Sequence, residues 1–235
     1  ECEAMKRGLL VFSGDHGLMA RALGLKIADR FAYKRGEKEF PPEVFPYLAE
    51  MNGERIMYKR DFFFTNLCLS NPEVRKRIID VMIDNMLKNP HIANANLTLG
   101  DGTHNHCECA VCRTKRPSDW MVITLNELDE ELTARGIDKI ISFSFYVDRM
   151  FPPAYEKIKN PDRFIFQYCP ITRSYTSTVT PDSEIPPVKP YIRNKWVAPK
   201  TSEECFSYLK EWQKAHKGSR LWLGYLDGGS ASCLP

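Results

Sequence analysis

Segments with the pattern of buried β-strands alternate with segments of helical periodicity along most of the chain. One unit runs from the apolar segment Phe62–Cys68 through a Ser-Asn-Pro-Glu helix start at residues 70–73 into apolar side chains at helical spacing. The next unit joins the strand-like segment Asn94–Leu99 to a helix that opens at Ser118 and ends at Gly136. Repeated strand–helix units of this kind predict a parallel α/β fold.

The remaining segments extend the same pattern. Further strand candidates are Leu9–Phe12, Lys139–Tyr146, Phe164–Cys169 and Leu221–Leu226, and further helices are expected over Gly17–Phe31 and after the capping box of Thr201 and Glu204. Neither of the glycine-rich phosphate-binding motifs of nucleotide-binding sheets follows a strand. We therefore favour a (β/α)8 TIM-type barrel over an open doubly wound sheet, with residues 1–235 in a single domain.

The strand candidates fall short of a complete barrel. Six are found, whereas a barrel of this type has eight strands. The chain also begins at Glu1 without a methionine and stops at Pro235 soon after a strand-like segment. We therefore expect a fragment of a longer chain, with an incomplete barrel here and additional domains in the parent protein. The sequence predicts no localisation.

Composition argues against two classes of partner. The net charge is only +3, and the Lys and Arg residues are spread rather than massed, so a nucleic-acid partner is not expected. No apolar run approaches the roughly 20 residues of a membrane span. The chain is 43% hydrophobic and 27% charged, which is ordinary for a soluble globular protein.

Three of the eight cysteines lie within six residues, in the pattern Cys107-x-Cys109-x2-Cys112. This spacing allows three thiolates to reach one tetrahedral ion if another element supplies a fourth ligand. A disulfide between two of the three would close a small, strained ring, and a redox role for the triplet is a further alternative. Zinc is favoured over an iron–sulfur cluster because the chain has no longer cysteine run of ferredoxin type.

Three residues are candidates for the fourth ligand. Cys68 ends the strand candidate next to the one that precedes the triplet, so barrel order would bring it close. His106 adjoins Cys107, so it is harder for both side chains to bind one ion with good geometry. His104 is separated from Cys107 by two residues and is less constrained. We favour Cys68, which gives a closed four-thiolate zinc site of the structural type.

Polar side chains stand at the ends of several strand candidates. In a (β/α)8 barrel these positions face the end where active sites are assembled. They are Asp15, His16, Asn66, Cys68, Asp101, Tyr146, Asp148 and Asp227.

Two motifs carry a resemblance to a known family. The segment Asn66–Glu73 followed by a helix, and Leu99-Gly-Asp-Gly102 leading into the cysteine triplet, resemble a bacterial family of domains of unknown function. That family is grouped with glycoside-hydrolase-like barrels near the alpha-glucuronidases. The resemblance runs from about Arg7 to Asp227, and its most specific part is the triplet with the preceding Asp-Gly. It implies a TIM-type barrel with missing strands and carbohydrate substrates, but it brings no proven reaction.

A glycosidase needs two carboxyl groups across the scissile bond, about 5 to 5.5 Å apart for retention or about 6.5 to 9.5 Å apart for inversion. The candidates are Asp101, Asp148 and Asp227. Asp101 is the strongest, because glycines on both sides leave its backbone open and its strand leads into the cysteine loop. Each of the three also fits a turn or a cap. No glutamate stands at a strand end, which departs from many sugar hydrolases.

The substrate-binding candidates are His16, Tyr146, Arg173, Trp196 and Tyr225. Aromatic rings can stack on the apolar face of a pyranose, although most aromatic residues on strands belong to the core. Trp196 and Arg173 lie in a proline-rich connection, residues 172–199, whose length is typical of functional loops. The Arg173 guanidinium would suit a uronate carboxylate.

The sequence and the resemblance together predict a carbohydrate-active barrel domain with a structural zinc site. In the first hypothesis it is a glycosidase that uses aspartates at strand ends. In the alternative the same cleft binds a glycan without cleaving it. Two acids that face one pocket at a suitable distance would favour the enzyme, and a single acid would favour the binding domain.

Overall fold

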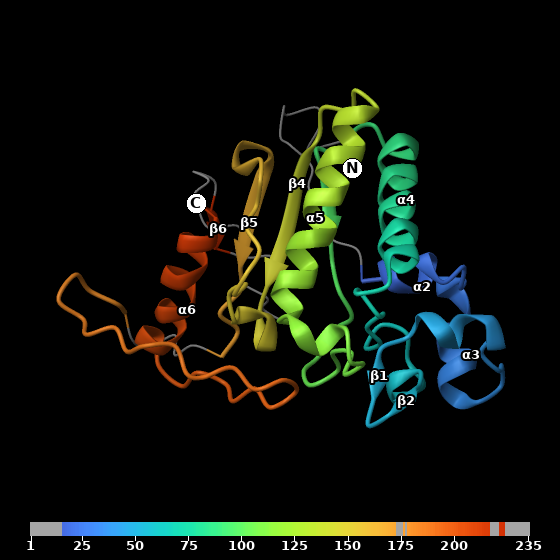
Figure 1. The fold of residues 1–235 in the computed structure, drawn as a ribbon, viewed down its shortest axis with the longest axis horizontal. Helices are drawn as coiled ribbons and strands as arrows, with labels where there is room; N and C mark the ends of the chain where they lie inside the picture. The colour runs from blue at the N-terminus through green and yellow to red at the C-terminus, as the bar shows by residue number, and fades with distance from the viewer. Residues whose placement is uncertain (1–15, 173–175, 177, 217–220, 224–235) are drawn as a thin grey trace.

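The main sheet of the protein has four parallel strands in sequence order. The computed structural model describes residues 16–172, 176, 178–216 and 221–223 (Figure 1). The strands are β3 (Asn94–Leu97), β4 (Ile140–Phe145), β5 (Phe164–Tyr168) and β6 (Leu221–Leu223), and each pairs in parallel with the next. All four were expected from the sequence, although β3, β4 and β5 are shorter than their apolar segments.

The prediction of a (β/α)8 barrel is wrong. Within the described residues the parallel strands form an open sheet, with β3 and β6 at its two edges. The strand expected at Phe62–Cys68 is a turn-rich segment whose one strand-like contact is the isolated bridge between Leu67 and Leu48. The candidate strand Leu9–Phe12 lies outside the described residues.

Asp61 explains why the aromatic run after it does not extend. Its carboxylate accepts a hydrogen bond from the backbone N–H of Phe63 at 3.1 Å, and its carbonyl accepts one from the Thr65 hydroxyl at 2.9 Å. These local bonds offer the backbone an alternative to a strand ladder. Phe62 is therefore buried through a turn rather than through sheet pairing.

Three long helices lie on the viewer's side of the sheet in Figure 1: α4 (Pro72–Lys88), α5 (Pro117–Ala134) and α6 (Ser202–Ala215). Each begins at a capping signal. Asn71 accepts from the backbone N–H of Glu73, and Thr201 accepts from that of Glu204. The carboxylate of Asp119, the third residue of α5, accepts from the backbone N–H of Arg116.

The two faces of the sheet differ in polarity because strand side chains alternate. On the face toward the helices, Phe143 and Phe145 of β4 and Phe166 of β5 pack against the Trp212 ring of α6. The opposite face carries a polar ladder in which Asn94 and Asn96 donate to the Ser142 hydroxyl at 2.5 and 2.8 Å. Ser144 donates to Gln167 in the same way at 2.7 Å.

A smaller N-terminal part precedes the sheet and packs onto α4 through α2 (Leu18–Ala22). The helix expected over residues 17–31 ends early, because Gly24 takes a left-handed conformation with φ +74° and α3 (Arg30–Arg35) starts afresh. Strands β1 (Glu50–Met51) and β2 (Glu54–Arg55) form an antiparallel hairpin. Short 3-10 helices lie at Ile27–Asp29, Pro42–Tyr47, Tyr58–Arg60, Cys112–Thr114, Val147–Met150 and Pro161–Arg163.

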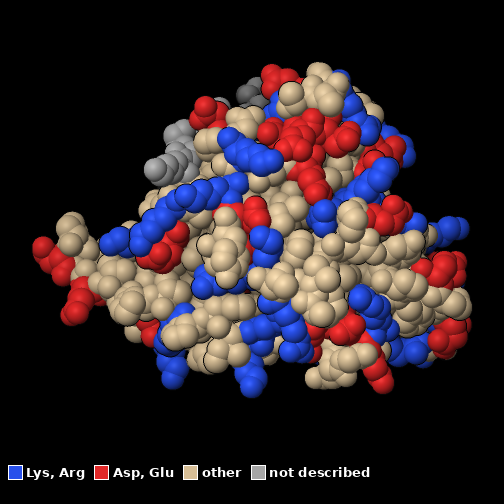
Figure 2. Space-filling model, viewed as in Figure 1, with Lys and Arg blue, Asp and Glu red and all other residues tan. Residues whose placement is uncertain are grey.

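The surface agrees with the modest net charge. Lys and Arg side chains are interspersed with Asp and Glu over the face shown in Figure 2. Among the described helices, none is both long enough and apolar enough to cross a membrane.

Candidate metal centre

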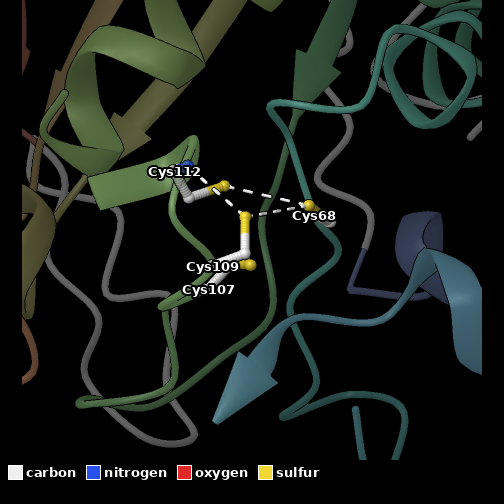
Figure 3. A group of neighbouring side chains, drawn as sticks. All are labelled: Cys68, Cys107, Cys109 and Cys112. Carbon is white, nitrogen blue, oxygen red and sulfur yellow. Dashed lines mark hydrogen bonds between the residues drawn. The ribbon is translucent and has the colours of Figure 1, made fainter. Parts of the chain in front are cut away.

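Four cysteines from two distant segments meet beside the β1–β2 hairpin. Cys68 follows the Leu67 bridge, and Cys107, Cys109 and Cys112 come from the loop after β3 (Figure 3). All four ligand atoms lie within 4.8 Å of one another. The cysteine residues are buried except Cys109, which is partly exposed. The structure thus brings together the four cysteines that the sequence analysis selected.

The distances between sulfur atoms suit a shared ion. The Cys68 sulfur lies 3.7 Å from that of Cys109 and 3.9 Å from that of Cys112. A zinc ion bound at about 2.3 Å to each of four sulfurs in a tetrahedron would place neighbouring sulfurs about 3.8 Å apart. A disulfide requires about 2.05 Å. The cluster therefore has the dimensions of a tetrahedral thiolate site, and all four cysteines are free.

Backbone N–H groups donate to two of the sulfur atoms. The N–H of Glu50, in β1, lies 3.2 Å from the Cys107 sulfur. The N–H of Cys112 lies 3.4 Å from the Cys109 sulfur, as the chain turns back on itself after Cys109. Such donors favour the thiolate over the thiol, which is the form that binds a metal.

Two side chains close to the cluster add to this polarity. The Ser70 hydroxyl lies 3.1 Å from the sulfur of Cys112 and 3.4 Å from that of Cys68. Burial would lower the pKa of the Arg55 guanidinium, but the nearby cysteine sulfurs, Cys68 first, outweigh burial and raise it. Arg55 is therefore placed to offset part of the negative charge of a metal–thiolate centre.

The thiols compete for protons when no cation is present. Hydrogen bonds from Cys107 and Cys112 lower the pKa of the Cys68 thiol, whereas hydrogen bonds to Cys107 and Cys68 raise the pKa of the Cys112 thiol. Four thiolates at these distances repel one another, so the cluster alone does not support full deprotonation. A divalent cation would remove this conflict, because coordination deprotonates a thiol outright.

The long connection before α6 is tied to the cysteine loop. We call residues 188–197 the strap. Arg193 donates to the carbonyls of Cys107 at 2.9 Å and of Cys112 at 2.7 Å. Asn194 accepts from the backbone N–H of His106 at 3.0 Å and donates to the His106 carbonyl at 2.8 Å. The strap is therefore hydrogen-bonded to the backbone of the loop that holds three of the cysteines.

The two histidines near the triplet have partners of their own. The His106 ring nitrogen Nε2 lies 3.0 Å from the Asp148 carboxylate, and His104 Nε2 lies 3.0 Å from the Trp196 carbonyl. Neither histidine belongs to the four-residue ligand group. Among the described residues, the group that could hold a metal consists of the four cysteines alone.

Asp148 is a buried, ionised carboxylate. Burial would raise its pKa, but His106, Arg149 and the backbone N–H of His104 together lower it to about 2. Its two oxygens are occupied at 3.0 Å by His106 and at 2.8 Å by the His104 N–H. A carboxylate with so low a pKa and no exposed oxygen is poorly suited to donate a proton to a substrate. Its contacts make it a positioning residue for the loop instead.

Asp101 lies at the carboxyl end of the sheet and is only partly buried. Its Oδ1 accepts from the Tyr146 hydroxyl at 2.7 Å and from the Gly102 backbone N–H at 2.8 Å. Burial raises the pKa of Tyr146 to about 12, with the Asp101 carboxylate adding to the rise and the Arg149 guanidinium opposing it, so this tyrosine stays a donor at neutral pH. Asp101 therefore accepts a hydrogen bond within its own Gly-Asp-Gly turn and also one from the Tyr146 side chain.

The other predicted site residues are scattered. His16 is exposed in the turn before α2, and Trp196 packs against the small buried cluster of Tyr146, Val147 and Cys169. Asp227, Arg173 and Tyr225 lie outside the described residues.

Sequence reasoning missed the residues that support the cysteines from a distance. Ser70 stands two residues after Cys68, and this proximity was a usable signal. Arg193 and Asn194 gave none, because they meet the cysteine loop across more than 80 residues of chain. Arg55 likewise reaches the cluster only through the fold of the hairpin.

The comparisons with known proteins bear on the family alone. A family model described as "Domain of unknown function (DUF4838)" matches residues 25–222. No curated protein and no solved structure matches the chain. The predicted resemblance to a family of uncharacterised domains agrees with this match, whereas its grouping with glycoside hydrolases and its bacterial origin stay predictions.

Proposed function

From the premise that the chain belongs to the family "Domain of unknown function (DUF4838)", we propose that its cysteine cluster is a structural zinc site. The observation that carries the proposal is the convergence of four free cysteine sulfurs within 4.8 Å of one another. Zinc favours four-coordinate sites of this composition.

The site is of the closed, structural kind because four protein thiolates fill a tetrahedral coordination shell. A catalytic zinc ion keeps one position open for water or substrate. In this arrangement Cys68 anchors the loop of residues 100–116 to the segment before α4, and Glu50 adds a backbone bond from the hairpin. The ion would thus fix a long loop at the carboxyl end of β3, in addition to the hydrogen bonds that this loop receives from Trp120 of α5 and from Arg193 of the strap.

Metal analysis of the purified chain tests this proposal. We expect about one zinc ion per chain, and replacement by Co²⁺ should give the visible absorption bands of a tetrahedral thiolate complex. Cys109→Ser and Cys68→Ser should each lose most of the metal and lower the thermal midpoint. Cys205→Ser is the matched control, because it removes a buried thiol on α6 that is not part of the cluster. Wild-type zinc content in Cys109→Ser would refute the assignment.

A glycan-binding role at the carboxyl end of the sheet is the second candidate. It is supported by the pairing of the partly exposed Asp101 with Tyr146, near the cluster against which Trp196 packs. Of the three predicted catalytic aspartates, Asp148 has both oxygens occupied inside the protein, which leaves Asp101 as a single acid among those described. A single acid favours binding over hydrolysis.

A screen of the chain against aryl glycosides and uronides, with Asp101→Asn beside it, separates the two carbohydrate hypotheses. We expect glycan binding that weakens in Asp101→Asn, without turnover. Turnover that Asp101→Asn abolishes would instead establish the glycosidase. If the chain shows no binding and no turnover, the carbohydrate role is ruled out, and the zinc proposal is unaffected.

A further inference from the structure

The geometry points to a binding site for a carboxylate ligand at Arg149, in the turn of residues 147–150 that follows the carboxyl end of β4. Arg149 is one of the largest fully buried side chains of the protein, with 1% of its surface exposed. Its Nη1 donates to the Gly100 carbonyl at 2.7 Å, and its guanidinium lies over the Tyr146 ring at 4.3 Å. Its Nε and Nη2 have no hydrogen-bond partner within the described part of the chain.

These two nitrogens form one edge of the guanidinium, and that edge is the one arginine uses to grip a carboxylate with two parallel bonds. The same protein shows this use elsewhere. Arg30 donates through Nε and Nη2 to the two oxygens of Asp61, both at 2.8 Å. Arg35 donates through the same pair of atoms to Glu37 at 2.5 and 2.8 Å. In Arg149 the Nη1 atom is fixed by its bond to the Gly100 carbonyl, and the Nε–Nη2 edge has no carboxylate bound to it.

The two nearby acids accept hydrogen bonds from donors other than Arg149. Asp148 adjoins Arg149 in the chain, but its oxygens accept from His106 and from the His104 backbone. Asp101 Oδ1 accepts from Tyr146 and the Gly102 N–H. These carboxylates offset the charge of Arg149 at longer range, and the donor edge is left unmatched. An arginine buried with unmade charged hydrogen bonds is costly, so a fold that keeps one there points to a ligand that completes it.

The surroundings include a further unmatched donor. Trp196 of the strap packs against Tyr146, Val147 and Cys169, and its indole N–H is also buried without a partner. Cys169 lies near enough to Arg149 for the guanidinium to lower its thiol pKa, although burial is the larger effect and leaves that pKa raised to about 11. Cys169 therefore stays a neutral thiol. Unmatched donors around a fixed cation select a ligand with acceptor oxygens, and a planar carboxylate fits the flat fork.

Titration with sodium acetate and sodium malonate, followed by thermal shift and by the ¹⁵N–¹H signal of the Arg149 Nε group, tests the inference. We expect saturable stabilisation of the wild-type protein and a shift of that signal. Because the site is enclosed, the effect should persist in about 0.5 M NaCl, which screens binding to surface arginines. Inorganic phosphate should bind more weakly because a tetrahedral phosphate is bulkier than a carboxylate group and the arginine edge is buried, and phosphate binding stronger than that of either carboxylate would overturn the assigned ligand class.

Arg149→Lys keeps the positive charge but loses the fork. It should bind acetate and malonate roughly tenfold to a hundredfold more weakly, as expected for the loss of a charged hydrogen bond. Arg135→Lys is the control, since Arg135 is an exposed arginine paired with Glu131, and it should bind as the wild type does. Should Arg149→Lys fail to fold, the signal of Arg149 Nε in the wild-type protein still decides. A signal that no carboxylate shifts would overturn the inference.

Discussion

At the residue scale, the hydrogen bonds of Asp148 make its ionised carboxylate a contributor to the stability of the fold. The residue follows Val147, which holds a left-handed φ of +50° that is unusual for a β-branched side chain. This turn directs the Asp148 carboxylate to His106 and to the His104 backbone and places Arg149 in the interior. The strained backbone is thus compensated by charged hydrogen bonds that close the carboxyl end of the sheet.

The low pKa of Asp148 predicts a specific loss of stability in acid. Its folded-state pKa is about 2, below its ordinary value of 3.8. The ion therefore contributes stability, about 2 kcal/mol, that is fully present above pH 4 or so and is lost as the pH falls toward about 2. Urea unfolding of the wild type and of Asp148→Asn should differ by about this amount at neutral pH.

The difference between the two proteins should then shrink below about pH 4. Comparison with Asp148→Asn is essential, because acid also protonates the cysteine cluster in both proteins and that effect cancels. A difference that stays constant across this range would show that the ionised form of Asp148 is not what the fold requires.

Gly100 is a second residue whose identity the packing dictates. A Cβ at this position would lie 2.6 Å from the Thr65 carbonyl oxygen and 3.0 Å from the Asn66 nitrogen, both backbone atoms. Its own N–H donates to the Asn66 side chain at 2.9 Å. Gly100→Ala should therefore destabilise the protein by about 1–3 kcal/mol, the usual range for overpacking. Chemical denaturation measures this, and a change within about 0.5 kcal/mol would mean that the two segments separate easily.

At the element scale, the four strands of the main sheet and the three long helices were the predictable part, whereas the β1–β2 hairpin was not predicted. Their signals are local: period-two alternation in β4 and β5, Asn71 with Pro72 at the start of α4, and Thr201 with Glu204 at the start of α6. The strand predicted at residues 62–68 was wrong. The apolar residues there are buried in turns stabilised by side-chain hydrogen bonds, which hydrophobicity alone cannot distinguish from a strand. The predicted barrel was wrong as well, because closure of a barrel depends on pairing between strands that are distant in the sequence, and no local pattern encodes that pairing.

The start of α4 gives a prediction for this scale. The Asn71 side chain accepts from the Glu73 backbone N–H at 2.9 Å, so Asn71→Ala should cost about 1 kcal/mol of stability in urea denaturation. Asn71→Asp keeps an acceptor at the cap and should retain most of that stability. Metal content should be unchanged in both variants, because only the Asn71 backbone bonds to Cys68. Equal stability of Asn71→Ala and Asn71→Asp would contradict the capping role.

At the scale of the whole molecule, the candidate metal centre was predictable and its setting was not. Three cysteines within six residues favour a metal-ligand group whichever fold surrounds them. Cys68 was selected on an expected barrel order, and the structure brings it to the triplet through the Leu67–Leu48 bridge instead. The strap could not be foreseen, because most of its contacts with the loop are to backbone N–H and carbonyl groups, which nearly every residue possesses.

The strap and the metal should stabilise each other. Arg193 and Asn194 bond to the backbone of the loop that carries three cysteines, so a loop that loses its metal also loses the shape the strap recognises. Chelation of the metal should therefore speed amide hydrogen exchange across residues 188–197 more than across β4 or α5. Unchanged exchange in the strap after metal loss would show that the two are independent.

Thermodynamic linkage makes this coupling reciprocal. Arg193→Gln removes the bonds to Cys107 and Cys112 and should weaken metal binding by the same factor as metal loss weakens strap docking, on the order of fivefold or more. Competition with a metal-binding dye measures that factor. Lys195→Gln is the matched control, since the side chain of this strap residue is exposed and has no hydrogen bond or ion pair to the loop within the described part of the chain, so metal affinity should stay as it is. Equal affinities in Arg193→Gln and Lys195→Gln would mean that the strap rests on the centre without stabilising it.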